Sequence, residues 1–305
     1  MKLIGTMPVR NEDWCLALSL RVALLWLDEI VVLLHDCTDE SGEIVWQCIR
    51  ENDRGRIHVL REHGEWFEMK HRQAMLEKAR ARGATHIAIV DADEVLTGNL
   101  LHDNILYVRR AIDAEGIADI RGTRPGELLQ FPLYNLRGGL NRYHSNGIWG
   151  GKSTCLAFPD DPRLNWNMER LHHHRHPKGA PLTPYAPIKS GGGGIIHLWG
   201  ASERRLRAKH ALYKVRERLL LPGKAVVAID REYSWAIHGD PQNPNHGTPE
   251  NWTYTEVPAA WWAPYGKWLQ HLHVDAVPWQ EAEVQRLVAK HGREAFAGLD
   301  LFGVV

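Results

Sequence analysis

Three acidic side chains stand at the end of a short apolar stretch. The sequence HIAIVDADE at residues 86–94 passes from apolar residues to Asp91, Asp93 and Glu94. Such a run is typical of a buried strand in an α/β sheet, whose carboxyl end is where the sheet presents a ligand site. Carboxylates at i and i+2 of an extended backbone point the same way. Asp91 and Asp93 are thus predicted to hold one divalent cation that in turn binds a diphosphate. A strand end merely capped by acids is the alternative.

The elements that must position these acids alternate between strands and helices. Apolar runs predict strands at residues 2–7, 30–34, 57–60 and from 86, and helical periodicity predicts helices at 13–27, 43–50 and 66–82. This order predicts an α/β fold with a Rossmann-like, doubly wound and mostly parallel sheet. Further strands are expected at 128–133 and 153–158, and further helices at 100–112, 203–221 and 280–291.

Composition indicates a globular protein without a dominant charge. The chain has 305 residues, 44% of them hydrophobic, and its 37 Lys and Arg balance 37 Asp and Glu. No global field therefore attracts nucleic acid or anionic lipid. Apolar runs near ~20 residues are absent, which predicts no membrane span, and the N-terminus does not look like a signal peptide. The four cysteines lack C-x-x-C spacing, so free thiols and a cytoplasmic location are expected.

Polar residues follow three of the predicted strands and are expected to lie on one rim of the sheet. They are MPVRNE at residues 7–12, HDCTDES at 35–41 and VDADE at 90–94. This ordered set resembles the GT-A fold glycosyltransferases of the family 2 type. The resemblance covers residues 1–115 well, extends to about residue 215 and says little about the rest.

The resemblance implies a GT-A fold and a metal-dependent glycosyltransferase of the hexosyltransferase type. Such an enzyme moves a sugar from a nucleoside-diphosphate sugar, here expected to be a UDP-sugar, to a hydroxyl acceptor with inversion. Departure of the diphosphate puts charge on the β-phosphate, which bound Mn²⁺ or Mg²⁺ stabilises. The implied catalytic domain spans 1–220, with a nucleotide-sugar half at 1–115 and an acceptor and metal-completing half at 116–220. A Trp-rich, partly helical C-terminal extension at 221–305 would pack on it.

By the same resemblance, the first two polar segments contact the nucleotide base and ribose. The residues concerned are Pro8, Val9, Arg10, Asn11, Glu12 and Asp36. Family members usually carry two acids at the start of the second segment, and here His35 replaces the first. The identity of the base therefore stays open.

The donor phosphates and the cation would be held by the next group of residues. The guanidinium fork of Arg72 suits a diphosphate or an aspartate, with a solvated helix residue as the alternative. Asp91 and Ala92 would lie at the ribose or a metal-bound water. Asp93 would ligate the cation and so act in catalysis, whereas Glu94 would face elsewhere, as a structural or acceptor-facing residue.

Later segments supply candidates for the rest of the site. His197, in GIIHLWG at 194–200, would complete the metal shell, although a lone His on an apolar strand is usually a core residue. Glu169 is the candidate base for the acceptor hydroxyl, with His172 in reserve. Trp149 would stack on a sugar or fill the core. The aromatic residues between 252 and 279 form either an acceptor platform or, as we favour, a packing surface.

Three rival functions stay open. A nucleotidyltransferase would carry a Gly-rich basic loop after its first strand, and TMPVRNEDW has no glycine there. A non-catalytic sugar or nucleotide binder on a GT-A scaffold is the second rival, and the intact Asp91 and Asp93 argue against it. The third concerns the acceptor, which could be DNA carrying hydroxymethylated bases, because the predicted helix is basic over residues 204–218. The neutral net charge favours a glycan or a small molecule as acceptor instead.

Overall fold

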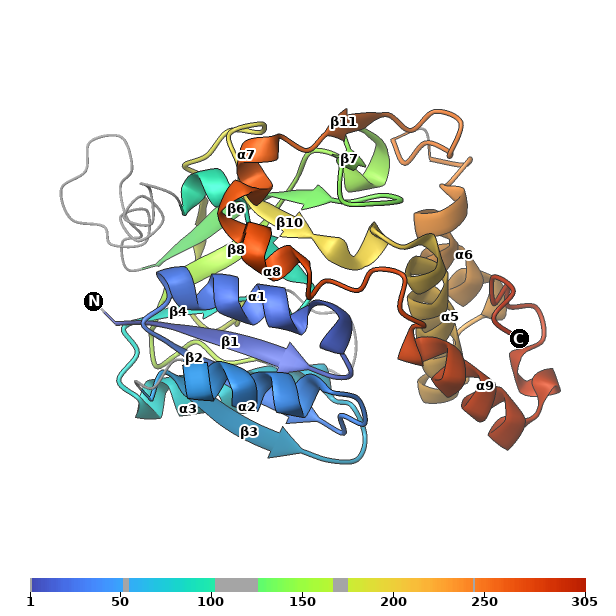
Figure 1. Ribbon diagram of the computed structural model, residues 1–305. Coiled ribbons are helices and arrows are strands. Elements are labelled where there is room, and N and C mark those ends of the chain that lie inside the picture. Colours follow the sequence, from blue (N-terminus) through green and yellow to red (C-terminus); the bar gives the residue numbers. More distant parts are fainter. Residues whose placement is uncertain (1, 52–54, 102–125, 167–174, 244) are drawn as a thin grey trace. The chain divides into compact units, whose positions relative to one another are not determined.

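The computed structural model describes the chain except residues 1, 52–54, 102–125, 167–174 and 244 (Figure 1). The chain forms two compact units. Unit 1 consists of Met1–Leu133, Lys152–His197 and Pro258–His273, and unit 2 of Tyr134–Gly151, Leu198–Val257 and Val274–Val305. Most of the helix predicted at 100–112 lies outside the described residues.

A parallel sheet forms the first part of unit 1. Its strands are β1 (Leu3–Val9), β2 (Glu29–His35), β3 (Ile57–Glu62) and β4 (His86–Ile89). They lie in the order β3-β2-β1-β4 with every neighbouring pair parallel. The connecting helices are α1 (Asp13–Trp26), α2 (Ser41–Glu51) and α3 (Glu68–Ala81). The predicted α/β class is confirmed, and the carboxyl ends of these strands share one edge.

Antiparallel strands extend this sheet beyond β4. They are β8 (Lys152–Pro159), β6 (Glu127–Asn135), β10 (Ile195–His197) and β5 (Glu94–Leu96). The short β9 (Thr183–Tyr185) pairs with β6 in parallel. The pairing of β10 with β5 sets His197 opposite Glu94. It therefore brings a histidine to the acids that follow β4.

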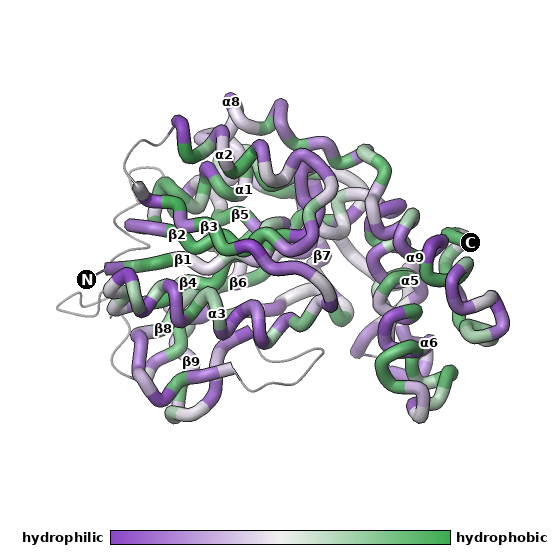
Figure 2. The backbone as a smooth tube through the Cα atoms, turned by 90° about the horizontal axis from the view of Figure 1, so that it is seen from below, coloured by the Kyte–Doolittle hydropathy of each residue, from purple (hydrophilic) through white to green (hydrophobic). Residues whose placement is uncertain are grey.

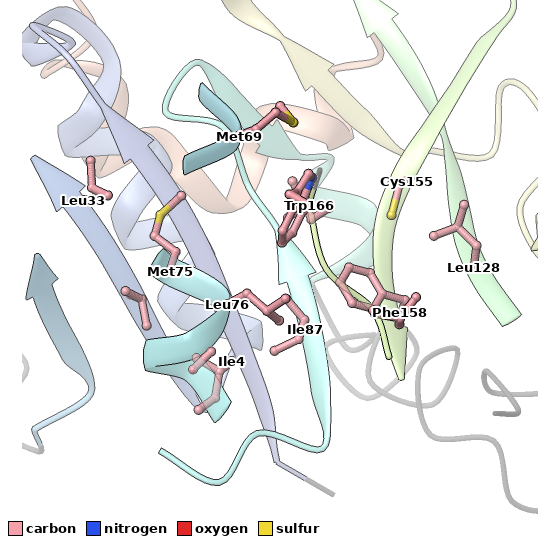
Figure 3. Close-up of a cluster of buried hydrophobic side chains, with 14 residues drawn as sticks. Ile4, Leu33, Met69, Met75, Leu76, Ile87, Leu128, Cys155, Phe158 and Trp166 are labelled. Carbon is pink, nitrogen blue, oxygen red and sulfur yellow. The ribbon is translucent and has the colours of Figure 1, made fainter. Parts of the chain in front are cut away.

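Apolar side chains fix α3 against the sheet. Met75 and Leu76 of α3 are fully buried and belong to one cluster with Ile4 of β1 and Ile87 of β4 (Figure 3). The hydropathy colouring shows the same character along β1 (Figure 2). On β1, a Cβ at Gly5 would lie 2.4 Å from Leu27 Cδ1, so a larger residue there would require the Leu27 side chain to shift.

Unit 2 is mainly helical. It holds α5 (Glu203–Leu220), α6 (Val226–His238) and α9 (Trp279–His291), which share a buried apolar cluster. It also holds the antiparallel pair β7 (Arg142–His144) and β11 (Tyr254–Glu256). The sequence did not predict α6. Its buried Ile229, Tyr233 and Ile237 recur every four residues, which is a helical spacing within a stretch otherwise rich in Pro, His and Trp.

The segment carrying α7 (Ala259–Trp262) and α8 (Gly266–Leu269) packs within unit 1. Tyr265 is fully buried, and its hydroxyl donates a 2.6 Å hydrogen bond to Leu96 O. Trp261 is also buried. These two aromatic residues therefore pack, as favoured above, instead of forming an open platform. Among the helices that the structure describes, none has the length and apolar character to cross a bilayer.

Candidate functional site

The first two polar segments lie where parallel pairing places them. Pro8 and Val9 are the last residues of β1 and pair with Leu33 and Leu34 of β2. Arg10, Asn11 and Glu12 follow at once and lead into α1. The carboxyl ends of β1 and β2 therefore present these residues at one edge of the sheet, as predicted.

Two residues of this edge have a left-handed backbone. Asn11 has φ 55° and Asp36 has φ 43°. Such values are uncommon for residues other than glycine and persist where surrounding contacts hold them. The Asn11 amide donates to Thr38 Oγ1 at 3.2 Å and accepts from Thr38 N at 2.7 Å. The loops after β1 and β2 are thus joined.

Asp36 joins the loop after β2 to the loop after β3. Its carboxylate accepts a 2.9 Å hydrogen bond from Gly64 N and lies 2.9 Å from His63 Nδ1. The contact with His63 is the main reason that the pKa of Asp36 is lowered. The predicted role of Asp36 at the nucleotide base remains a prediction, and in this structure its carboxylate is engaged by the neighbouring loop.

The acids after β4 do not have the predicted backbone. β4 ends at Ile89, and Glu94 N donates a 3.0 Å hydrogen bond to Asp91 O, so residues 91–94 form a turn. The expectation of an extended chain across Asp91 and Asp93 is therefore wrong, because the chain turns there before entering β5. Ala92 O accepts from Cys15 Sγ at 3.2 Å, which ties the turn to α1.

Asp91 lies between two guanidinium groups. Arg72 Nη2 donates to Asp91 Oδ1 at 3.2 Å, and Arg175 Nη1 lies 3.8 Å from Asp91 Oδ2. Burial favours the neutral carboxyl, but Arg72 and then Arg175 outweigh it, and the pKa of Asp91 is lowered. Arg72 is itself buried and also donates to Glu68 Oε1 at 2.9 Å. The alternative of a solvated Arg72 is wrong.

Asp93 faces a histidine instead. His197 Nε2 lies 3.5 Å from Asp93 Oδ2, with side-chain exposures of 21% and 9%. The β10 and β5 pairing described above produces this approach. Of the three predicted cation ligands, Asp93 and His197 are thus brought together, whereas Asp91 contacts Arg72 and Arg175.

These residues fit a divalent cation in both spacing and charge. Two ligand atoms that share an ion at about 2.2 Å each lie roughly 3 to 3.6 Å apart, which suits Asp93 and His197. Glu68, Asp91 and Glu94 contact a guanidinium, of Arg72 or Arg175. Asp93 lies beside His197 instead and supplies a negative charge for the ion. No three potential protein ligands converge among the described residues. Mg²⁺ and similar ions commonly take one or two carboxylates and complete their shell with phosphate oxygens and water.

The remaining candidates lie elsewhere or are not described. Trp149 belongs to unit 2, where its ring meets Trp199 edge-on at 4.9 Å and its carbonyl accepts from Asn135 Nδ2 at 2.9 Å. This contact agrees with the core-filling alternative within that unit. Glu169 and His172 lie outside the described residues, so the acceptor base stays a prediction.

The residue that sequence reasoning missed is Arg175. It lies between His174 and His176 in a segment rich in Pro, His and Gly, and no pattern there marks it as the partner of a distant acid. Its partner Glu94 was noted only as facing away from Asp93. A third acid beside an Asp-x-Asp pair was the available signal, since buried acids require counter-charges.

Comparison with known proteins gives low similarity. No known family model and no curated protein matches this sequence. The structure of residues 1–349 of S. aureus TarS is similar to this chain at 14% sequence identity and a TM-score of 0.45. The match covers 97% of this chain and 89% of the TarS chain. TarS has also been solved with UDP-GlcNAc.

Two further solved structures overlap with smaller parts of the chain. Glucosyl-3-phosphoglycerate synthase from Mycobacterium tuberculosis, with Mn²⁺, UDP and phosphoglyceric acid, has 14% identity and a TM-score of 0.29 over 44% of this chain and 43% of its own. GalNAc-T7 with UDP, GalNAc and Mn²⁺ has 16% identity and a TM-score of 0.32 over 65% of this chain and 35% of its own. TM-scores of this size do not establish that this chain shares the activity of these neighbours.

Proposed function

We propose that this protein is a metal-dependent glycosyltransferase that uses a nucleoside-diphosphate sugar, with a UDP-sugar as donor, and a hydroxyl acceptor. The observation that carries the proposal is the 3.5 Å approach of His197 to Asp93 at the end of β4, beside an Asp91 held by two arginines. Carboxylates gathered at the edge where doubly wound sheets bind ligands suit a divalent cation.

Each residue has a distinct task in this proposal. Asp93 and His197 hold Mn²⁺ or Mg²⁺, and the ion supplies charge stabilisation for the departing diphosphate. Asp91 is kept ionised by Arg72 and Arg175 and accepts from the ribose or from a metal-bound water. The end of β1 from Pro8 with the loop that follows it, and the loop that begins at Asp36, enclose the base and ribose. The hydrogen bonds between Asn11 and Thr38 form that part of the site in advance.

The first test is a thermal-shift screen of nucleoside diphosphates with and without Mn²⁺. We expect UDP to raise the melting temperature of the wild type only with the metal, and Asp93→Ala to abolish this shift because the ion loses a ligand. Glu43→Ala is the matched control, since Glu43 is an exposed acid that pairs with Arg50 on α2. If no diphosphate stabilises the wild type at millimolar concentration, the proposal is wrong.

Transfer must then be separated from binding. Incubation with UDP-sugars and Mn²⁺ should release UDP, slowly to water and faster with a hydroxyl acceptor. Analysis of the anomeric product decides the predicted inversion. A protein that binds UDP and Mn²⁺ but never releases UDP from any sugar donor would be a non-catalytic binder.

A further inference from the structure

A buried ion pair lies behind the acidic turn at residues 91–94. Arg175 contacts both carboxylate oxygens of Glu94 through Nη1 and Nη2, and Nη2 also donates to Ile89 O at 3.2 Å. The exposed fractions of the two side chains are 15% and 4%. A two-pronged contact of this kind fixes orientation as well as charge.

The same guanidinium reaches beyond Glu94. Arg175 Nη1 lies 3.8 Å from Asp91 Oδ2, whereas Arg72 donates to the other oxygen, Asp91 Oδ1. Arg175 therefore connects the first and last residues of the turn, while Asp93 lies between them and faces His197. Any rotation of this turn would move all three acids together.

We propose that Arg175 and Glu94 are positioning residues that fix the turn so that Asp93 faces His197 for cation binding. This inference rests on the proposed function. Glu94 is suited to the role because its backbone pairs with His197 while its side chain is held by Arg175. Its orientation thus determines on which side of the turn Asp93 emerges.

A purely structural ion pair is the competing explanation. Buried pairs often add little net stability, because desolvation offsets the Coulomb attraction. Their removal still destabilises a protein when one charge is left unpaired. A useful test must therefore measure metal-supported ligand binding separately from folding.

Calorimetric titration of UDP, with Mn²⁺ and with chelator, makes that separation. We expect Glu94→Gln and Arg175→Lys to weaken the Mn²⁺-supported affinity for UDP by about tenfold or more, as loss of residues that orient metal ligands typically does. Mn²⁺ titration by electron paramagnetic resonance should show the same loss. Each variant's melting temperature reports folding.

Asp160→Asn is the matched control. Arg80 also forms a two-pronged contact with Asp160, at 2.8 and 3.0 Å, and that pair is similarly buried within unit 1. Its loss should lower the melting temperature and leave the UDP and Mn²⁺ affinities unchanged. A lowered affinity in this control would overturn the inference, because any buried pair would then have the same effect.

A charge-swapped double variant, Glu94→Arg with Arg175→Glu, distinguishes the two explanations further. It restores an ion pair but places a carboxylate near Asp91. We expect it to regain stability over Arg175→Glu alone without regaining metal-supported binding. If Glu94→Gln binds UDP and Mn²⁺ as the wild type does, this inference alone is wrong; if the wild type binds neither, the proposed function fails with it.

Discussion

Asn11 and Thr38 hold the loops after β1 and β2 together through two hydrogen bonds, of 2.7 and 3.2 Å. The backbone of Asn11 is left-handed, with φ 55°. Asp36 extends the same arrangement to the loop after β3. The proposed nucleotide-binding edge is therefore formed before a ligand arrives, which lowers the entropy cost of binding.

Asn11→Ala should weaken both folding and UDP binding. The variant loses two partly buried hydrogen bonds and leaves alanine at a positive φ, which together cost roughly 2–3 kcal/mol of unfolding free energy. Urea denaturation and UDP calorimetry measure the two effects. Glycine tolerates the positive φ, so Asn11→Gly should lose less unfolding free energy than Asn11→Ala. Its affinity for UDP should fall as much as that of Asn11→Ala. Unchanged UDP affinity in both variants would contradict a preformed edge.

His197→Ala should remove the metal dependence of UDP binding. The variant takes one of the two proposed protein ligands from the ion, so the Mn²⁺ affinity in the presence of UDP should fall by at least about tenfold. Mn²⁺ titration by electron paramagnetic resonance measures it. His238→Ala, an exposed histidine of unit 2, is the control. Equal Mn²⁺ affinity in His197→Ala and wild type would remove His197 from the site.

The local elements of unit 1 could be predicted because each carries its own pattern. The helix predicted at 13–27 is observed at Asp13–Trp26, and the strand predicted at 30–34 is observed at Glu29–His35. Parallel order then places the loops that follow them on one edge. That reasoning led to Asn11, Asp36 and Asp91 from the sequence alone.

Contacts between distant strands and side chains could not be predicted in this way. The turn at 91–94 leads into β5, which pairs with the distant β10, and nothing in the apolar run before Asp91 marks it. The contact of Glu94 with Arg175 joins residues 81 positions apart. Periodicity reports which face of an element is buried, and it does not report which charge will neutralise a buried acid.

The stability of unit 2 should fall in acid because of His210. Burial, followed by the charge of Lys209, lowers the pKa of His210 to about 3. In the unfolded chain its pKa is about 6.5, so between these values only the unfolded state takes up the proton, and the unfolding free energy falls as pH decreases.

His210→Phe keeps a ring beside Trp199 and Tyr213 and removes this proton. Urea denaturation at about pH 7 and about pH 5 should show a loss of unfolding free energy that is up to roughly 2 kcal/mol smaller in the variant. The pKa values of His71 and His144 are also lowered to about 4, and these two residues contribute equally to the loss of unfolding free energy in the wild type and in His210→Phe. Identical losses in the variant and the wild type would contradict a neutral buried His210.

Gly98→Ala should loosen the segment at 258–273 from the rest of unit 1. An added Cβ would lie 2.4 Å from Pro264 Cδ and 2.7 Å from Trp261 O, and the second of these contacts is with backbone. Overpacking of this kind costs typically about 1–3 kcal/mol, measurable by urea denaturation. Gly42→Ala, on α2 with nothing within 4 Å, is the control and should instead gain about 0.4–1 kcal/mol. Stabilisation by both substitutions would show that α7 does not need the close approach at Gly98.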